Sequence, residues 1–260
     1  MDKTKIEWCD MSWNPVTGCL HECPYCYARR MAKRFGIDCS DGSVHELHEQ
    51  VYTPKAIETD EGKLARYHKK EPYPFGFDPT FHRYRLGEPA RKTKGRTIFV
   101  CSMADLFGDW VPEEWILKVF DACKVAPQHR YLFLTKNPKR YFELEKRKLL
   151  PWADNFWFGT SVTKADDEFV WFREKKFHWF ISMEPMLEGI DITTGAGVIL
   201  PEWIIVGAET GNRKDKVVPE FEWVKKLVDD CREFNTPVFM KNSIKPIWGE
   251  EIITEYPWER

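Results

Sequence analysis

After residue 96 the sequence alternates short apolar runs with longer amphipathic stretches. Each run has four to seven residues, is rich in Ile, Val, Phe and Trp, and is apolar throughout. Such runs are typical of parallel strands that are covered on both faces. We therefore expect strands over residues 97–101, 130–134, 156–160, 177–183, 203–206 and 237–240.

The stretches between these runs have the periodicity of amphipathic helices. Three of the four carry a proline at or near the start, where its fixed φ suits the first helical turn. We expect helices over residues 112–125, 138–149, 164–176 and 219–234. Repeated strand-helix units joined by right-handed crossovers predict an α/β sheet or barrel.

One more strand, near residues 6–13, brings the total to about seven and favours a complete or partial (β/α) barrel. The predicted fold class is therefore α/β, with the barrel as the preferred architecture. A doubly wound open sheet is the rival. The sequence lacks the Gly-x-Gly-x-x-Gly turn after the first strand that marks the dinucleotide-binding form of that sheet.

Length and charge limit the classes of protein further. A chain of 260 residues can bury one core, so we expect a single domain over residues 1–260. The formal charge of -2 gives no general attraction to polyanions, so any nucleic-acid contact must come from a local patch. The sequence has no apolar signal region at its start and no stretch that could span a bilayer, so we expect a cytoplasmic protein without a membrane partner.

Residues 36–96 interrupt the repeated pattern and are interpreted as an irregular insertion or lid. Long irregular segments in compact domains are usually lids, binding loops or partly disordered, and this one follows a cysteine-rich loop and its helix. Its last part, residues 83–96, has six basic residues and one acidic residue. This composition suits contact with a phosphate backbone, and a solvated loop is the alternative.

The cysteine-rich loop carries the strongest chemical signal in the chain. Cys19, Cys23 and Cys26 have a C-x3-C-x2-C spacing, and a helix is expected over residues 28–35, directly after the third cysteine. Thiolates bind iron-sulfur clusters, and a closed cubane site would supply four of them. Three cysteines in one loop therefore indicate a [4Fe-4S] cluster with one iron left open for another ligand.

A zinc site is the alternative for the same loop. Thiolates with two-residue spacing also suit Zn²⁺, and His21, Cys9 or Cys39 could complete the four ligands. Structural zinc sites usually pair two such couples, and this chain has no second C-x2-C. A zinc-stabilised nucleic-acid-binding module thus stays open as a second function, and an electron-transfer protein with a four-cysteine cluster as a third.

The loop resembles the C-x3-C-x-aromatic-C signature of radical S-adenosylmethionine enzymes, with Tyr25 at the aromatic position. The resemblance implies that Cys19, Cys23 and Cys26 ligate the cluster, that the open iron binds S-adenosylmethionine, and that Tyr25 flanks the adenosine. It implies a reductive cleavage to a 5'-deoxyadenosyl radical, fed by a reductant such as flavodoxin or ferredoxin. The hard chemistry then belongs to the cofactors.

More of the chain resembles the phage-associated three-Cys-motif family. The blocks that carry this resemblance are residues 13–19, 26–28, 102–107, 134–136, 184–185 and 207–210. The phage association, the aromatic residues and the basic segment 83–96 favour a nucleotide or DNA base as substrate. We expect an isomerase or transferase type of modification, such as rearrangement of a hypermodified base.

Polar residues recur just past the ends of the predicted strands, where barrel enzymes assemble their sites. They are Ser102, Asp105, Thr135, Lys136, Ser161, Glu184, Glu209 and Lys241. Strands also end in polar turns for structural reasons, so any one of them has an ordinary explanation.

With S-adenosylmethionine in the site, charge suggests a role for each group. Ser102 and Asp105 would receive the ammonium, Ser161 and Glu184 the ribose hydroxyls, and Gly207 would allow close approach to adenine or methionine. The catalytic candidates are Lys136, Glu209 and Lys241, facing the substrate. Either lysine could instead pair with one of the acids at the rim.

Overall fold

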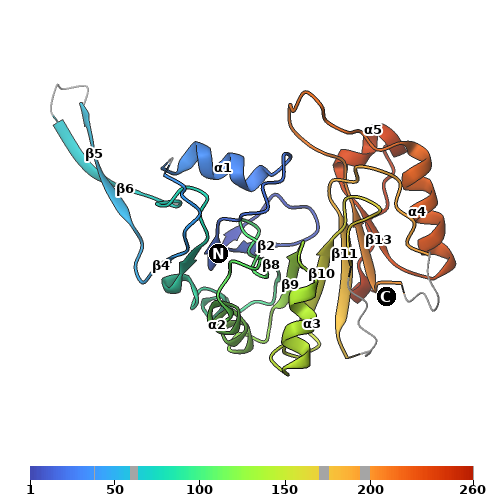
Figure 1. The fold of residues 1–260 in the computed structure, drawn as a ribbon, viewed down its shortest axis with the longest axis horizontal. Helices are drawn as coiled ribbons and strands as arrows, with labels where there is room; N and C mark the ends of the chain where they lie inside the picture. The colour runs from blue at the N-terminus through green and yellow to red at the C-terminus, as the bar shows by residue number, and fades with distance from the viewer. Residues whose placement is uncertain (38, 59–63, 170–175, 194–199, 260) are drawn as a thin grey trace.

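The computed structural model describes residues 1–37, 39–58, 64–169, 176–193 and 200–259, and its main element is an eight-stranded sheet (Figure 1). The outermost strand, β1, runs antiparallel to β2, and every other neighbouring pair is parallel. The strands, in their order across the sheet, are β1 (Asp2–Lys3), β2 (Met11–Trp13), β8 (Thr97–Val100), β9 (Arg130–Thr135), β10 (Phe156–Ser161), β11 (His178–Met183), β12 (Trp203–Val206) and β13 (Val238–Met240).

The order of the strands in the sheet follows their order in the chain, so the sheet is wound in one direction. A doubly wound sheet reverses its order at a switch point, and this sheet does not. All six strands predicted after residue 96 are present; β9 and β10 are one residue longer than expected, and β8, β11 and β13 are one residue shorter. Among the described residues no pairing joins β13 to β1 or β2, so a closed barrel is not shown and the barrel stays a prediction.

Three amphipathic helices, α2 (Glu113–Lys124), α3 (Lys139–Lys146) and α4 (Phe221–Glu233), follow strands as predicted. Their buried side chains share one core cluster with residues of the parallel strands. Two further helices, α1 (Tyr27–Phe35) and α5 (Lys245–Trp248), lie near the carboxyl ends of the strands (Figure 1).

The helix expected over residues 164–176 is wrong for its first half. Residues 164–166 form a bend and a turn, residues 167–169 have no regular secondary structure, and residues 170–175 lie outside the described part. The carboxylate of Asp167 accepts hydrogen bonds from the backbone N–H groups of Thr163 and Lys164. An acidic side chain that binds nearby backbone in this way favours a turn over a helix.

The opposite face of the sheet carries a second apolar cluster that is rich in aromatic rings. Its buried members are Trp8, Phe99, Leu132, Trp157, Phe180, Trp203, Ile205 and Phe239. Near the C-terminus, Trp258 closes this cluster, with its ring centroid 5.4 Å from that of Trp157 and 5.1 Å from that of Trp203. Both faces of the parallel strands are therefore covered, which explains why the runs are apolar throughout.

The insertion at 36–96 is more regular than expected. It contains β4 (His45–Leu47), a hairpin of β5 (Tyr52–Glu58) and β6 (Leu64–Lys70), and β7 (Thr80–His82), which pairs with β3 (Val16–Thr17) and β4. Figure 1 shows the hairpin extending away from the rest of the protein. The hairpin strands were missed because they lack the apolar runs that identify buried strands.

The longest described helix, α4, has 13 residues. A membrane-crossing helix needs about 20 consecutive, mainly apolar residues. None of the helices in the described ranges reaches the length and apolar character that this requires.

Candidate functional site

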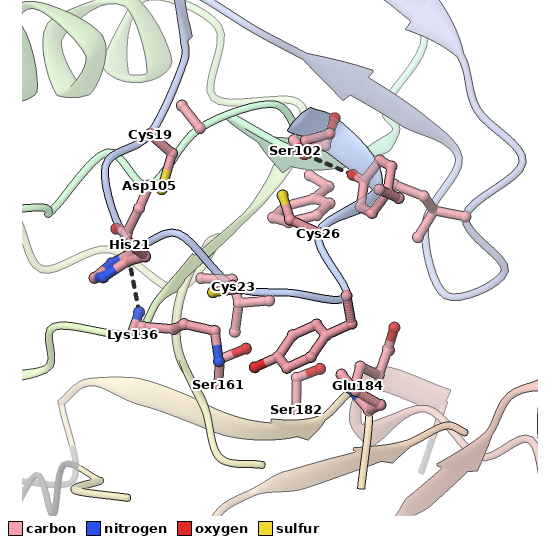
Figure 2. A pocket seen from close by; sticks show the side chains of 18 of the residues that line it. Cys19, His21, Cys23, Cys26, Ser102, Asp105, Lys136, Ser161, Ser182 and Glu184 are labelled. Atoms are coloured by element: carbon pink, nitrogen blue, oxygen red, sulfur yellow. Dashed lines mark hydrogen bonds and ion pairs between the residues drawn. The ribbon is translucent and has the colours of Figure 1, made fainter. Parts of the chain in front are cut away.

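A pocket opens at the carboxyl ends of strands β8 to β13, between these ends and the cysteine loop (Figure 2). Its volume of about 230 Å³ exceeds what a single metal ion fills, so it has room for an organic ligand beside the thiols. The eight polar residues predicted from the strand ends all line it, together with Tyr25 and the three cysteines. Gly207 is the one predicted site residue that is not part of the lining.

The pocket is built by the alternation of side chains along the strands. In β11, Phe180 belongs to the aromatic cluster, and Ser182 and Glu184 follow it at two-residue steps into the pocket. Leu134 of β9 and Lys136, two residues further along, likewise both line the pocket. Successive residues of a strand point to opposite faces, so one face changes from apolar to polar as the strands reach the pocket.

Backbone contacts fix the cysteine loop against the insertion. Gly18 has a φ of 87°, and a Cβ atom on it would lie 2.1 Å from the backbone oxygen of Asp78, so only glycine fits. The N–H of Cys19 donates to the carbonyl of Phe77 at 3.1 Å. At the other end of the loop, Cys26 is the N-cap of α1 and its Sγ accepts the N–H of Arg29 at 3.3 Å.

The three cysteines are free thiols of intermediate burial. Burial raises the pKa of Cys19 to about 12 and also raises that of Cys23, while nearby Lys136 acts to lower the Cys23 value. A cation bound at the loop would favour the thiolates that burial disfavours.

The spacing of the thiols bears on which metal they suit. Around a tetrahedral Zn²⁺ with bonds of about 2.3 Å, two sulfur atoms lie roughly 3.8 Å apart. Within the described ranges, no group of three that includes these cysteines has all its ligand atoms within 4.8 Å of one another. The three cysteines therefore do not form such a close three-ligand group, and all three line the pocket.

Asp105 connects the loop to the strand ends. Its Oδ1 accepts from Thr135 Oγ1 at 2.7 Å and from the Phe107 N–H at 3.0 Å. Its Oδ2 accepts from the Lys136 N–H at 2.9 Å and lies 2.7 Å from Nε2 of His21. The carboxylate is buried, so its oxygens are largely engaged by protein donors. This geometry favours a positioning role over the expected reception of an ammonium group.

Glu184 and Lys241 form an ion pair across the pocket floor. Nζ of Lys241 lies 2.8 Å from Oε2 of Glu184, and the indole N–H of Trp8 donates to Oε1 at 2.8 Å. Burial acts to lower the pKa of Lys241, but the carboxylate of Glu184 raises it overall. A Cβ atom on Gly207 would lie 2.9 Å from Cδ of Lys241 and 3.3 Å from Cγ of Glu184. Gly207 therefore makes room for this ion pair.

Glu209 is held by a residue that the sequence reasoning missed. Arg213 donates to both of its carboxylate oxygens, at 2.7 Å each. These bonds lower the pKa of Glu209, so the buried carboxylate is ionised and paired. A free catalytic base is not what this arrangement provides. The sequence does place a basic residue four positions after an acidic one, a spacing that indicates an ion pair within a helix. No helix was predicted over these residues, so the pair was not expected.

Lys136 lies beside the cysteine loop, with its Nζ 5.5 Å from the ring centroid of Tyr25. Burial acts to lower its pKa, but the Tyr25 hydroxyl and the Cys23 thiol raise it overall, so the ammonium is retained. Of the predicted rim lysines, this one has no ion pair among the described contacts with the rim acids. It offers a positive charge to a ligand.

Ser102 lies at the loop side of the pocket. Its hydroxyl donates to Oδ1 of Asn14 at 3.2 Å, and Asn14 also accepts the N–H of Met103 at 2.9 Å. Asn14 directly follows β2, so it is one more polar residue at a strand end, and the sequence reasoning did not single it out as a positioning residue.

Ser182 was missed because it lies inside a strand that reads as apolar. It is fully buried, its hydroxyl has no hydrogen-bond partner, and it lines the pocket beside Ser161 (Figure 2). Buried hydroxyls are normally satisfied, because an unsatisfied one costs about 1–3 kcal/mol. An orphaned hydroxyl at the pocket wall indicates a place for a polar group of a ligand.

The basic segment 83–96 contributes no residue to the pocket lining. It precedes β8, which begins at Thr97, so it leads into the amino end of that strand while the pocket lies at the carboxyl end. Arg83 and Arg85 within it are engaged with protein groups, as Arg85 donates to the backbone oxygen of Asn14 at 2.9 Å and Arg83 lies near Glu114. The expected contribution of this segment to substrate binding at the pocket has no support in this geometry.

Fold and site together define an α/β protein with a thiol-bordered pocket at the carboxyl ends of its parallel strands. The family described as "Protein of unknown function (DUF5131)" matches residues 3–252, so the chain belongs to this family. No curated protein and no solved structure matches the chain.

The family match corrects the expectation from the sequence. The cysteine loop and the blocks after it resemble radical S-adenosylmethionine enzymes and the phage-associated three-Cys-motif family, but the family that matches over nearly the whole chain is DUF5131. The assignment was wrong because it depended on one short loop and a few blocks of two to seven residues. Such local patterns follow from metal binding and turn chemistry, which unrelated families share.

Proposed function

We propose that this protein is an enzyme that holds a [4Fe-4S] cluster on Cys19, Cys23 and Cys26 and binds S-adenosylmethionine beside it. The observation that carries the proposal is that three cysteines of one loop all line a single pocket, together with polar side chains from the strand ends. Three protein thiolates leave one iron of a cubane without a protein ligand. When bound and reduced, such a cluster supplies the electron that cleaves the sulfonium of S-adenosylmethionine to a 5'-deoxyadenosyl radical.

The side chains around the pocket suit the parts of that cofactor. The orphaned hydroxyl of Ser182 and the neighbouring Ser161 offer hydrogen bonds to ribose hydroxyls. Glu184 has its oxygens held by Trp8 and Lys241, so it is fixed in position and still has unused lone pairs for a ligand donor.

Positioning residues hold the cysteine loop at the pocket. Asp105 fixes His21 and the backbone after β9, and Cys26 is anchored at the start of α1. These contacts fix both ends of the loop that carries the three cysteines.

For the substrate, we propose a nucleotide or a nucleic-acid base that is modified or rearranged by hydrogen abstraction. Support comes from the lining, which includes the aromatic ring of Tyr25, and from Lys136, which offers an ammonium for a phosphate. The basic segment 83–96 lines no part of the pocket and does not support this choice of substrate.

The proposal is tested by anaerobic reconstitution of the full chain with iron and sulfide, followed by reductant and S-adenosylmethionine. The expected result is a brown protein that forms 5'-deoxyadenosine. Cys19→Ser, Cys23→Ser and Cys26→Ser should each abolish that product. Cys9→Ser and Cys39→Ser are matched controls outside the loop and should keep both cluster and product.

Two outcomes would contradict the proposal. A colourless protein with one tightly held zinc would favour the metal-stabilised binding module. A cluster that is lost in Cys9→Ser or Cys39→Ser, and that gives no 5'-deoxyadenosine in the wild type, would favour an electron-transfer protein with four cysteine ligands.

A further inference from the structure

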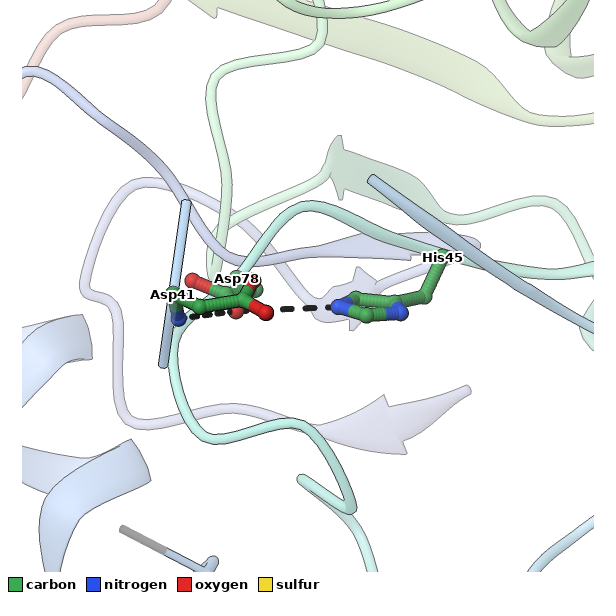
Figure 3. Close-up of side chains that lie close together, drawn as sticks. All are labelled: Asp41, His45 and Asp78. Carbon is green, nitrogen blue, oxygen red and sulfur yellow. Dashed lines mark hydrogen bonds and ion pairs between the residues drawn. The ribbon is translucent and has the colours of Figure 1, made fainter. Parts of the chain in front are cut away.

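A second group of potential metal ligands lies in the insertion, behind the cysteine loop. Asp41, His45 and Asp78 each place one ligand atom within 4.8 Å of the other two (Figure 3). Among the described residues, no other group of three or more His, Cys, Asp and Glu side chains meets this condition. The group shares no residue with the cysteine loop or with the lining of the pocket.

The histidine is the most informative member of the group. Nε2 of His45 is buried and makes no hydrogen bond. It lies 3.6 Å from Oδ2 of Asp78, which is too long for a hydrogen bond. Two ligands of one ion with bonds of about 2.0–2.2 Å lie roughly 3.0–3.5 Å apart, so a small inward shift places both on a shared cation.

The site is held in place by the surrounding chain. The ring of His45 stacks on Phe75, with 3.9 Å between centroids and an interplanar angle of 7°. Its backbone N–H donates to Pro79 at 2.8 Å. The buried carboxylate of Asp78 accepts the N–H groups of Asp41 and Gly42 at 2.8 and 3.1 Å. Each of its oxygens therefore keeps a lone pair for an ion.

We propose that Asp41, His45 and Asp78 form a structural site for a divalent transition-metal ion. One imidazole nitrogen and two carboxylate oxygens suit ions such as Mn²⁺ or Zn²⁺, while Mg²⁺ and Ca²⁺ prefer oxygen ligands alone. The three protein ligands leave further positions for water, since Asp41 is exposed.

The ion would brace the base of the cysteine loop. Asp78 is the residue whose backbone packs against Gly18, and the preceding Phe77 accepts the N–H of Cys19. Asp41 and His45 lie on the segment that enters β4. An ion bound to both segments would restrict the motion of the backbone around Phe77 and Asp78, which contacts Gly18 and Cys19.

Mn²⁺ alone is the probe that separates this site from the thiols, because it prefers nitrogen and oxygen ligands to sulfur. The full chain is titrated with Mn²⁺ and the free ion is followed by electron paramagnetic resonance. Wild type and His48→Ala should bind one Mn²⁺ with the same affinity. His48 is a matched control three residues away, with its side chain 75% exposed.

His45→Ala and Asp41→Asn should weaken binding roughly tenfold or more. Circular dichroism shows whether each variant is folded. If His45→Ala does not fold, Asp41→Asn still tests the site, because Asp41 is exposed and its substitution should not disturb the fold. The proposal is overturned if folded wild type binds no Mn²⁺ at millimolar concentration, or if a folded ligand variant binds as tightly as His48→Ala. Neither result bears on the formation of 5'-deoxyadenosine, so this site and the proposed function stand or fall separately.

Discussion

Replacing Asp105 by asparagine removes one acceptor oxygen from the side chain that connects three parts of the site. In the wild type the two carboxylate oxygens serve the backbone N–H groups of Phe107 and Lys136, the hydroxyl of Thr135 and the ring of His21. An asparagine has one carbonyl oxygen and one NH₂ group. It therefore cannot satisfy the donors on both sides.

The cost follows from which donor loses its partner. If the amide oxygen stays at the position of Oδ1, the new NH₂ group faces the N–H of Lys136, and two donors oppose each other. Turning the amide over moves the loss to Phe107 and Thr135. An unsatisfied buried donor costs about 1–3 kcal/mol, and the lost charge-assisted bond adds about 1 kcal/mol. We expect Asp105→Asn to lower the free energy of unfolding by about 2–4 kcal/mol.

The measurement is urea unfolding of the reduced, metal-free protein, followed by circular dichroism. Asp109→Asn is the matched control, because Asp109 lies in the same loop, is exposed, and accepts from Asn137 at 2.7 Å. It should change the free energy of unfolding by less than about 0.5 kcal/mol. If Asp105→Asn lowers the free energy of unfolding no more than the control does, the positioning role is refuted. If Asp105 serves chiefly to bind an ammonium group, its substitution should change ligand affinity and leave the stability unchanged.

Two further predictions concern backbone fit and ion pairing. Gly18→Ala should destabilise the protein by about 2 kcal/mol more than Gly42→Ala. Both glycines have positive φ, but only at Gly18 would the new Cβ atom lie against backbone atoms. Urea unfolding of the two variants measures the difference. Equal losses would mean that the fit of Gly18 against Asp78 does not matter. Because Arg213 lowers the pKa of Glu209, the pair stabilises the fold above the ordinary carboxyl pKa, and this stabilisation is lost as pH falls through the lowered value. Arg213→Ala should therefore be less stable than wild type at pH near 7 and approach it as pH drops below about 4.5, and a difference that stays constant with pH would contradict this.

The sequence was sufficient to place the parallel strands and the pocket edge. Continuous apolar runs such as β11 mark strands with two covered faces, and polar residues after them meet at one edge because the strands are parallel. That is why Lys136, Glu184 and Lys241 line one pocket although they are far apart in the chain. The expected helix at 164–176 failed for a local reason, the capture of backbone N–H groups by Asp167.

Partners that depend on tertiary contact could not be read from the sequence. Trp8 donates to Glu184 across 176 positions, and nothing in either local sequence indicates the other. Ser182 lies in an apolar strand, where a serine is read as an ordinary small residue until its unpartnered hydroxyl is found at the pocket wall. The metal-ligand group of Asp41, His45 and Asp78 is assembled by the pairing of β4 with β7, which no apolar run predicts.

Trp8 gives the molecule an optical reporter of its own pocket. Its indole N–H is bound to Glu184, and its ring lies 4.7 Å from that of Phe99 within the aromatic cluster. A compound that takes over an oxygen of Glu184 must change the polarity around this indole. Tryptophan emission, compared between wild type and Trp8→Phe, can therefore register the arrival of a ligand before any product of a reaction is known.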